Sequence, residues 1–203
     1  MRGILGPGTG LGNSLLYPAS IKNLKQTFVL PSEGGHTDFP TIDAETADFF
    51  AFLVKETPYK YISLERSFCG PTIPMMFKFA AQRYPEDAEA SETPTSEKIV
   101  LVGVGADAPR IYKEAVDLLI KIYSAAIGNF ITTHVCLGGL YLVGSLTNSL
   151  LPRLEGVDIL KGFRERHPEV EHLVKKAPLV VCKEIDLGLK GAFYVARSIL
   201  KDL

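Results

Sequence analysis

The stretch Gly6-Pro7-Gly8-Thr9-Gly10-Leu11-Gly12 is the first part of the sequence whose residue types and spacing could do chemistry. Successive small residues in a tight turn let backbone N–H groups converge on an anion, and the Thr9 hydroxyl adds a further donor. A Walker loop is excluded because no Gly-Lys-Ser/Thr follows and the flanking runs resemble strands. Taken alone, the stretch fits a plain hairpin turn better than a phosphate cradle.

The second stretch with chemical potential is Glu33-Gly34-Gly35-His36-Thr37-Asp38. An ionised carboxylate can accept hydrogen bonds from two hydroxyls, and a nearby histidine can both donate and accept. This combination suits a polyol, whose neighbouring hydroxyls must each be paired when they are buried. The alternative is a Gly-Gly turn with surface polar side chains, and the motif alone slightly favours it.

A third pattern, Gly103-Val104-Gly105-Ala106-Asp107-Ala108, matches the dinucleotide-binding fingerprint. That fingerprint needs a strand before it, a helix after it, and an acidic residue about 20 positions further on at the end of a second strand. Tyr123 stands at that distance, inside a segment with helical periodicity, and no second strand intervenes. The sequence therefore argues against NAD binding.

These stretches must be positioned by strands and helices that the apolar patterning predicts. Residues 2–5 and 11–17 flank the glycine-rich turn as a β-hairpin, and residues 27–30 form a third strand stopped by Pro31. Two buried strands are expected at residues 135–143 and 178–182. Helices are predicted after Asp43 up to Pro58, from Ser63, and at residues 73–83, 97–104, 109–130, 148–154 and 188–200. Ser96 is expected to cap the helix at 97–104, and Ser145 or Thr147 the helix at 148–154. Residues 85–97, acidic and without Lys or Arg, are expected to form a solvated loop.

Composition narrows the class of protein further. The chain has 203 residues, which suits one generous domain, and its apolar fraction of 46% excludes a disordered tail or a disulfide mini-protein. A net charge of -1 argues against nucleic-acid binding, which requires a basic surface. The three cysteines are far apart and not spaced for a metal, so buried thiols in a reducing compartment are expected. The longest mostly apolar stretch, residues 135–146, is shorter than the roughly 20 residues of a membrane-spanning helix. We therefore expect a soluble, cytoplasmic protein.

Five motifs, taken together in their order along the chain, resemble the bacterial-type glucokinase family. The ordered set is far more specific than any single motif. The motifs are the stretches 6–12 and 33–39, Ser63-Leu64-Glu65-Arg66 with Cys69-Gly70-Pro71, the glycine-flanked run 138–144, and Gly188-Leu189-Lys190-Gly191-Ala192. The resemblance covers nearly the whole chain. It implies ATP-dependent phosphorylation of glucose at its 6-hydroxyl. It also implies an α/β fold of the ribonuclease-H-like, actin-like type: a large C-terminal domain over residues 1–203, with a mixed sheet flanked by helices.

The resemblance also implies roles for individual residues. Glu33, His36 and Glu65 would bind sugar hydroxyls. The nucleotide would be ATP with Mg²⁺, without a metal site made by the protein. Its contacts would be Gly8, Thr9 and Gly10 at the phosphates and Gly70, Gly139 and Gly144 along the nucleotide. Three departures affect the ATP side: Cys69 replaces a serine, Thr72 a glycine, and Ser145 the second glycine of a Gly-Gly pair.

Two motifs of the family do not occur in these 203 residues. One is an Asp-x-Gly-Gly-Thr phosphate loop, and the other is an Asn-Asp pair whose Asp acts as the base. No catalytic residue can therefore be named, and the resemblance predicts a truncated chain whose N-terminal small domain is missing and which is inactive alone. The alternative is a non-catalytic remnant that binds sugar or regulates a longer glucokinase. Apolar surface left by a missing domain would favour a homodimer.

Overall fold

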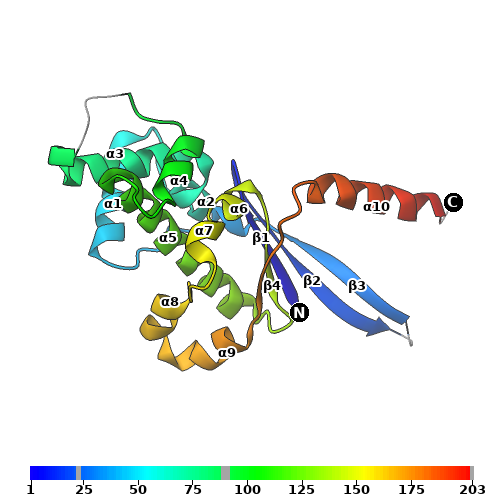
Figure 1. Cartoon of the computed structure of the whole chain (residues 1–203). Helices are drawn as coiled ribbons and strands as arrows, with labels where there is room; N and C mark the ends of the chain where they lie inside the picture. The colour runs from blue at the N-terminus through cyan, green and yellow to red at the C-terminus, as the bar shows by residue number, and fades with distance from the viewer. Residues whose placement is uncertain (22–23, 88–91, 202–203) are drawn as a thin grey trace.

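The computed structural model describes residues 1–21, 24–87 and 92–201. Its centre is one five-stranded mixed sheet in the order β3-β2-β1-β4-β5, with most of the helices gathered against it on one side (Figure 1). The strands are β1 (Arg2–Pro7), β2 (Leu11–Ile21), β3 (Leu24–Ser32), β4 (Leu140–Leu142) and β5 (Leu179–Val181). Strands β1, β2 and β3 are antiparallel neighbours, whereas β4 runs parallel to both β1 and β5.

The glycine-rich stretch forms the turn of the β1–β2 hairpin, which confirms that prediction. Pro7 pairs with Leu11, and within the turn the Gly8 N–H donates to the Gly10 carbonyl at 2.8 Å. The prediction that Pro31 stops the third strand is wrong, because β3 continues through Pro31 to Ser32. Since β3 is the edge strand, the missing N–H of a proline costs it no ladder hydrogen bond on its outer side.

The helices were largely expected from the apolar periodicity, but their limits differ in places. The α-helices are α1 (Ala44–Glu56), α2 (Leu64–Phe68), α3 (Ile73–Arg83), α4 (Ser96–Gly103), α5 (Arg110–His134), α6 (Ser145–Ser149), α7 (Leu151–Leu154), α8 (Lys161–Arg166), α9 (Glu171–Lys176) and α10 (Leu187–Lys201). Short 3-10 turns lie at η1 (Gly34–His36), η2 (Gly70–Thr72), η3 (Pro85–Asp87) and η4 (Pro168–Val170). Within residues 85–97, η3 and the start of α4 are therefore ordered, and residues 88–91 lie outside the described part.

Helix α1 begins at Asp43, as predicted, through a complete capping box. The Asp43 carboxylate accepts from the Thr46 N–H at 2.9 Å, and the Thr46 hydroxyl oxygen accepts from the Asp43 N–H at 2.9 Å. Lys121, from α5, donates to Asp43 at 2.9 Å and also pairs with Glu45, which in turn pairs with Arg83. This polar network ties the start of α1 to α5 and α3.

Lys121→Met is expected to reduce the amount by which the free energy of unfolding decreases between neutral and acid pH. Burial raises the pKa of Asp43 and Glu45, but their hydrogen bonds outweigh it, so both pKa values are lowered. Such carboxyls stabilise the fold above their unfolded pKa, and this stability is lost as the pH falls through the folded value. Removing Lys121 should cost less than about 1 kcal/mol at neutral pH, because the groups are partly solvated. Urea unfolding at several pH values between 7 and 3 measures this dependence of the free energy of unfolding on pH. An equal change in exposed Lys98→Met would contradict the assignment.

Helix α5 passes through the core. Its apolar side chains are buried, including Leu119, Ile122, Ile127 and Ile131 at 0% exposure. By length and composition α5 could cross a membrane, but 72% of its most apolar window is buried in the fold, as in a core helix of a soluble protein. The sequence interpretation overlooked this longer apolar segment.

The region after α5 departs most from the predicted pattern. The helix continues four residues beyond its expected end to His134 and stops at Val135, which has a left-handed φ of 49°. The buried strand predicted over residues 135–143 is present, but it is confined to Leu140–Leu142 and so begins five residues later than expected. A β-branched residue in the left-handed region is held there by its surroundings, which local propensity does not predict.

Further helix boundaries were also misjudged. The predicted helix over residues 148–154 is two short helices, α6 and α7. Gly144, rather than Ser145 or Thr147, is the N-cap of α6. Helix α4 is capped by Thr95 and not by Ser96. Helices α8 and α9 were not predicted at all, because each has only six residues and too few turns to show a period.

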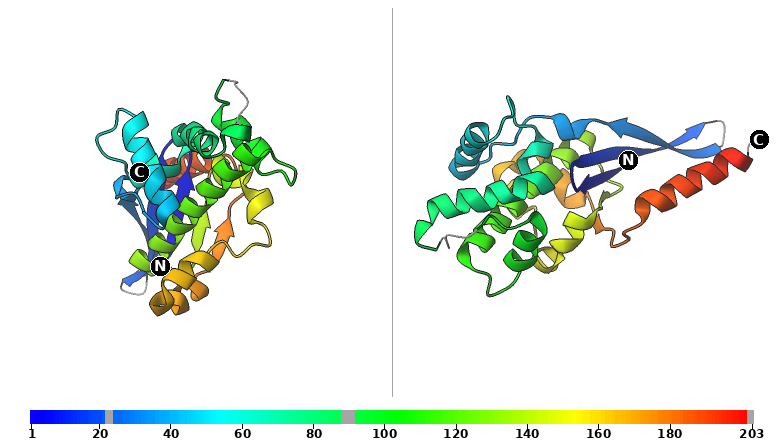
Figure 2. Two further views of the ribbon diagram at one scale, coloured as in Figure 1. Left: turned by 90° about the vertical axis from the view of Figure 1, so that its left-hand side faces the viewer. Right: turned by 90° about the horizontal axis from the view of Figure 1, so that it is seen from above.

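Two long elements extend away from the helical body on the same side. Figure 2 shows the β2–β3 hairpin and α10 both projecting outward. Helix α10 was predicted at residues 188–200 and is observed over Leu187–Lys201. The sheet, with the helices beside it, brings the hairpin turn, α2, the start of α4 and α6 to one end of the molecule.

Candidate functional site

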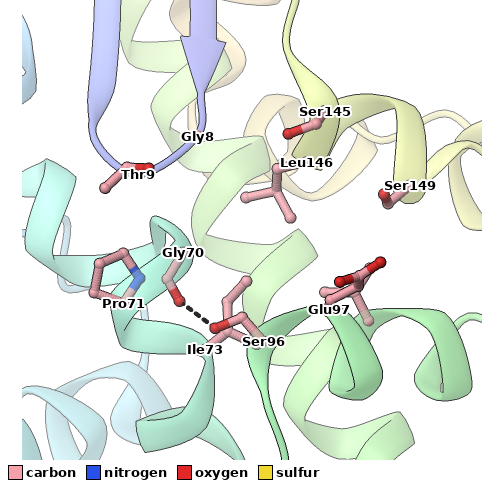
Figure 3. Close-up of a pocket in the computed structure, with 11 residues that line it drawn as sticks. Gly8, Thr9, Gly70, Pro71, Ile73, Ser96, Glu97, Ser145, Leu146 and Ser149 are labelled. Atoms are coloured by element: carbon pink, nitrogen blue, oxygen red, sulfur yellow. Dashed lines mark hydrogen bonds between the residues drawn. The ribbon is translucent and has the colours of Figure 1, made fainter.

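A cleft of about 540 Å³ opens where the hairpin turn meets the starts of α4 and α6 (Figure 3). Its volume lies within the range of about 300–1,000 Å³ that small-molecule sites occupy. Sequence segments that are far apart meet there: the hairpin turn, η2 and α3, α4, and α6. The lining residues are Gly8, Thr9, Gly70, Pro71, Ile73, Ser96, Glu97, Val100, Ser145, Leu146 and Ser149.

Backbone hydrogen bonds hold the glycine-rich turn against η2 to form one wall of the cleft. The Gly70 N–H donates to the Gly8 carbonyl at 2.8 Å, and the Ser96 hydroxyl donates to the Gly70 carbonyl at 2.7 Å. A Cβ on Gly70 would lie 3.2 Å from the Gly8 carbonyl oxygen, whereas a Cβ on Gly8 would meet nothing within 4 Å. Gly8 therefore leaves open space at the cleft, and Gly70 allows the close approach of two backbones.

The opposite wall depends on the backbone conformation of Gly144. Its φ is +98°, and a Cβ there would lie 2.9 Å from the Pro7 carbonyl oxygen. This conformation aims the start of α6 into the cleft, and the Ser145 side chain points into the opening (Figure 3). Ser145, the residue expected to stand in place of a glycine, therefore lines the cleft with its side chain.

Gly139 is not brought to the cleft. Gly3 N–H donates to its carbonyl at 2.9 Å, so it lies beside the start of β1, at the opposite end of β4 from Gly144. Its positive φ of 111° serves the turn between α5 and β4. The two glycines are five positions apart, a separation of about 16 Å in extended chain, and Gly139 is not among the residues that line the cleft.

The predicted sugar-binding residues lie on two neighbouring segments that both contact Leu11 at the end of the hairpin turn. The Glu65 carboxylate accepts from the Leu11 N–H at 2.8 Å, and a Cβ on Gly35 would lie 2.5 Å from the Leu11 carbonyl oxygen. The Leu64 N–H donates to the Thr37 carbonyl at 2.7 Å, which joins the two segments directly. Glu65 and the η1 turn are therefore positioned on either side of one residue.

Glu33 and His36 face solvent beside this junction. Their side chains are 92% and 58% exposed, and Glu33 Oε2 lies 3.8 Å from His36 Nε2. Among the residues that the structure describes, no element covers them. Their polar atoms are available to a ligand, and water competes for the same hydrogen bonds.

The other two residues that were expected to differ from the family pattern, Cys69 and Thr72, do not line the cleft. The Thr72 hydroxyl donates to the Arg66 carbonyl at 2.8 Å and so points away from the cleft. Burial raises the pKa of the Cys69 thiol to about 12, so Cys69 stays protonated and is no nucleophile. Of the three replacements only Ser145 lines the cleft.

A second, smaller cavity of about 200 Å³ lies behind Thr9 and Pro71, which it shares with the cleft. Its lining includes Glu65, Arg66, Thr57 and Thr72. The Arg66 guanidinium lies 4.0 Å from the centroid of the Tyr59 ring. Thr9 and Pro71 therefore stand between the two cavities, and Glu65 lines the second one beside the hairpin turn.

The cleft fits a nucleotide better than it fits a protein-bound metal. The hydroxyls of Thr9, Ser145 and Ser149 supply neutral donors of the kind that hold phosphate oxygens, whereas the Ser96 hydroxyl already donates within the wall. Glu97 is the only acidic residue of the lining, and the described part of the chain holds no group of three acidic, His or Cys side chains suited to a metal. Mg²⁺ usually reaches such sites on the nucleotide phosphates and keeps several waters, which this lining allows.

Sequence reasoning missed Ser96 and Glu97 as cleft residues. The residues were assigned to a helix start and a solvated loop, which describes their local structure adequately. They reach the cleft only because α4 packs beside η2 and α3. No local signal in the sequence reports that contact.

Comparison with solved structures identifies the fold. A glucokinase from Balamuthia mandrillaris in complex with glucose aligns with a TM-score of 0.76 at 23% identity, over 97% of this chain and 54% of that one. The glucokinase of an Antarctic psychrotroph aligns with a TM-score of 0.73 at 22% identity. A glucokinase of the ROK family from Streptomyces griseus, in complex with glucose and AMPPNP, aligns with a TM-score of 0.55. The fold is that of the actin-like sugar kinases.

Comparison of sequences then gives the family. A family model described as glucokinase matches residues 1–199, so the chain belongs to the glucokinase family. The glucokinases of Nostoc sp. and Synechocystis sp. are 30% and 28% identical to it over 97% and 96% of its length. The chain spans about 60% of the length of these curated relatives.

Proposed function

We propose that this chain provides the sugar- and ATP-binding surfaces of a glucokinase, as its large C-terminal domain. Glu33, His36 and Glu65 bind glucose hydroxyls. The hairpin turn (Gly8, Thr9 and Gly10), Gly70 and the Gly144–Ser145 corner surround the nucleotide. Gly139 has no part in this proposal, because of its position at the far end of β4.

The observation that carries the proposal is the meeting of both candidate sites at the hairpin turn. Glu65 and Gly35 contact Leu11 on one side, and Gly8 and Thr9 line the cleft on the other. Phosphoryl transfer depends mainly on positioning the sugar hydroxyl and the terminal phosphate in line. A turn that contacts both sites supports such an arrangement, as do the sugar and nucleotide in the related structures.

These residues can bind and orient, but none of them is placed to take the proton from the sugar hydroxyl. A catalytic base must lie within hydrogen-bond reach of that proton. Glu33 and His36 lie on the sugar side, where we assign them to hydroxyl recognition, and Glu65 is engaged by Leu11. We therefore expect the chain alone to bind its ligands without turning them over at the roughly 1–100 s⁻¹ of ordinary kinases.

Glucose titration tests the proposal. Calorimetry or NMR titration should show saturable binding of glucose. Because Glu33 and His36 are exposed to water, the dissociation constant should be on the order of millimolar. Glu33→Gln should weaken glucose binding roughly tenfold, because one charge-assisted hydrogen bond is lost. The matched control is Glu169→Gln, an exposed carboxylate on η4, away from the site. Glu169→Gln should titrate like the parent, and a Glu33→Gln titration whose midpoint lies at about tenfold higher glucose supports the assignment. No saturable shift in the parent protein overturns it.

A coupled assay with ATP, Mg²⁺ and glucose tests the expected inactivity. Turnover at an ordinary kinase rate would contradict it and would mean that a base exists within these residues. Glucose binding without turnover agrees equally with a non-catalytic, regulatory protein. Capture of a longer glucokinase in a pull-down, with a change in the rate of that enzyme, would favour the regulatory alternative.

A further inference from the structure

The second cavity, behind Thr9 and Pro71, combines side chains with opposite charges. Among the described residues that line it, only Glu65 and Arg66 are charged. Its volume of about 200 Å³ is below the roughly 300 Å³ at which sites for drug-sized molecules begin, so it suits a molecule smaller than a nucleotide. Thr9 and Pro71 separate it from the cleft, on the side of the cleft away from Ser145 (Figure 3).

Arg66 presents a guanidinium that has no carboxylate partner within the described part of the chain. Four other arginines each pair with a carboxylate: Arg83, Arg110, Arg153 and Arg164. The Arg66 guanidinium instead lies 4.0 Å from the centroid of the Tyr59 ring and 4.8 Å from that of the Tyr61 ring. Its Nη1 donates to the Tyr61 carbonyl at 3.4 Å, which leaves Nε–H and Nη2–H for a ligand. Two such parallel donors on a stacked, planar group match the oxygens of a phosphate or a carboxylate.

Three other polar side chains of the second cavity act as acceptors. The Thr57 and Thr72 hydroxyls each donate to a backbone carbonyl, at 2.7 and 2.8 Å, so their oxygens can still accept a hydrogen bond. The Glu65 carboxylate accepts from the Leu11 N–H, and a carboxylate has about four acceptor positions. These oxygens require donors, such as hydroxyl groups, from a ligand.

We propose that the second cavity binds a small phosphate ester that also carries free hydroxyl groups. The phosphate pairs with Arg66, and the hydroxyls donate to Glu65 and the two threonines. A bare anion would meet the charge of Glu65 without compensating hydrogen bonds, and a neutral polyol would leave Arg66 without a counter-charge. A phosphate suits the site better than a carboxylate, because Arg66 and the Thr9 hydroxyl together supply donors for its three oxygens.

Like charges on the two sides of Thr9 should couple the second cavity to the cleft. A phosphate ester in one and the phosphates of ATP in the other would be separated by a single side chain, and like charges repel over a few ångströms. The ester should therefore weaken the binding of a non-hydrolysable ATP analogue several-fold, and the analogue should weaken the ester by the same factor. This coupling rests on the proposed function, whereas the site itself does not.

Calorimetric titration with sn-glycerol 3-phosphate tests the site directly. We expect saturable binding with a dissociation constant on the order of millimolar, and Arg66→Gln should weaken it roughly tenfold or more. Arg66→Lys keeps the charge but loses the two parallel donors, so its affinity should be intermediate. The matched control is Arg110→Gln, which should stay within about twofold of the parent. The Arg110 guanidinium also lies close to a tyrosine ring, 3.6 Å from the Tyr84 centroid, but outside the cavity. Equal effects of the two glutamine variants, or no saturable binding by the parent at tens of millimolar, overturns the proposal.

Inorganic phosphate, glycerol and glycerate separate the two parts of the recognition. Inorganic phosphate should bind roughly tenfold more weakly than glycerol 3-phosphate, and glycerol should show no measurable binding. Inorganic phosphate that binds as tightly as the ester would overturn the role of the hydroxyl acceptors. Glycerate that binds as tightly as the ester would overturn the preference for a phosphate.

Methionine NMR determines which cavity holds the ester. Met75 lines the second cavity and not the cleft, and Met1 lies at the start of β1, outside both. In protein labelled at its methionine methyl groups, with Met75→Leu to assign the signal, glycerol 3-phosphate should shift the Met75 signal and leave that of Met1 unchanged. An unshifted Met75 signal under saturating ester would overturn the proposal.

The shape of the competition with the ATP analogue gives an independent test. Increasing glycerol 3-phosphate should raise the Kd of the analogue only to a plateau, because the two ligands bind together. A rise without a plateau would mean that the ester occupies the cleft, and would overturn the proposal. Absence of analogue binding would instead contradict the proposed function, since the ester titration and the Met75 signal require no nucleotide.

Discussion

Glu65→Ala is expected to lower glucose affinity by about 10- to 100-fold and to loosen the hairpin turn at the same time. The Glu65 carboxylate accepts from the Leu11 N–H, and Leu11 is only 6% exposed, so its N–H has little access to water once that acceptor is gone. A hydrogen bond to a charged group contributes about 1.5–3 kcal/mol, and leaving a buried donor unpaired costs about 1–3 kcal/mol. Both the free energy of unfolding and the glucose affinity should therefore decrease.

Glu65→Gln separates the two roles of this side chain. A glutamine oxygen can still accept from Leu11, so the free energy of unfolding should stay within about 1 kcal/mol of the parent value. The loss of negative charge should still weaken glucose binding roughly tenfold. Calorimetric glucose titration and urea unfolding of both variants give the comparison. If Glu65→Gln binds glucose like the parent while remaining as stable, Glu65 is structural and not a sugar ligand.

Gly10→Ala offers an independent test of the same contact. Its Cβ would lie 2.5 Å from Glu65 Oε2, so the carboxylate must move away from Leu11. We expect this variant to resemble Glu65→Ala in glucose affinity, although Glu33, His36 and Glu65 all remain. Such agreement would mean that the position of Glu65, and not only its charge, matters for the sugar.

Gly144→Ala is expected to lower the free energy of unfolding by about 3 kcal/mol or more. Its φ of +98° with ψ of 160° lies in a region essentially reserved for glycine, where another residue costs about 1–3 kcal/mol. The added Cβ would also meet the Pro7 carbonyl oxygen at 2.9 Å. Because Gly144 sets the direction of α6, displacement of Ser145 should weaken nucleotide binding as well.

Gly156→Ala is the matched control for this second prediction. Gly156 also has a positive φ, of 75°, but a Cβ there would meet nothing within 4 Å. Its substitution should cost only the backbone term, about 1–2 kcal/mol, without any effect on the cleft. Urea unfolding together with fluorescence titration of an ATP analogue measures both effects. Equal losses at Gly144 and Gly156, with unchanged nucleotide affinity in both, would contradict the role of the Pro7 contact.

The local elements near the glycine-rich turn were predictable because short-range chemistry determines them. Apolar runs on either side of a Gly-rich turn specify a hairpin, and Asp43 with Thr46 specifies the start of α1. The region from Val135 to Leu154 was not predictable in the same way. There the continuation of α5, the left-handed Val135 and the cap at Gly144 depend on packing against β1, which no window of sequence contains.

The candidate site also has features that the sequence determines and features that only the tertiary structure determines. The ordered motifs by themselves determined the family, the residue types able to bind a sugar, and the glycines that permit a close turn at Gly8–Gly10. Only the tertiary structure decided which of those residues meet. It brought Glu65 and Gly35 to Leu11, added Ser96 and Glu97 to the cleft, and placed Gly139 at the far end of its strand. The physical reason is that residue types and spacing act over a few positions, whereas a cleft is made by backbones from distant segments that approach within hydrogen-bond distance.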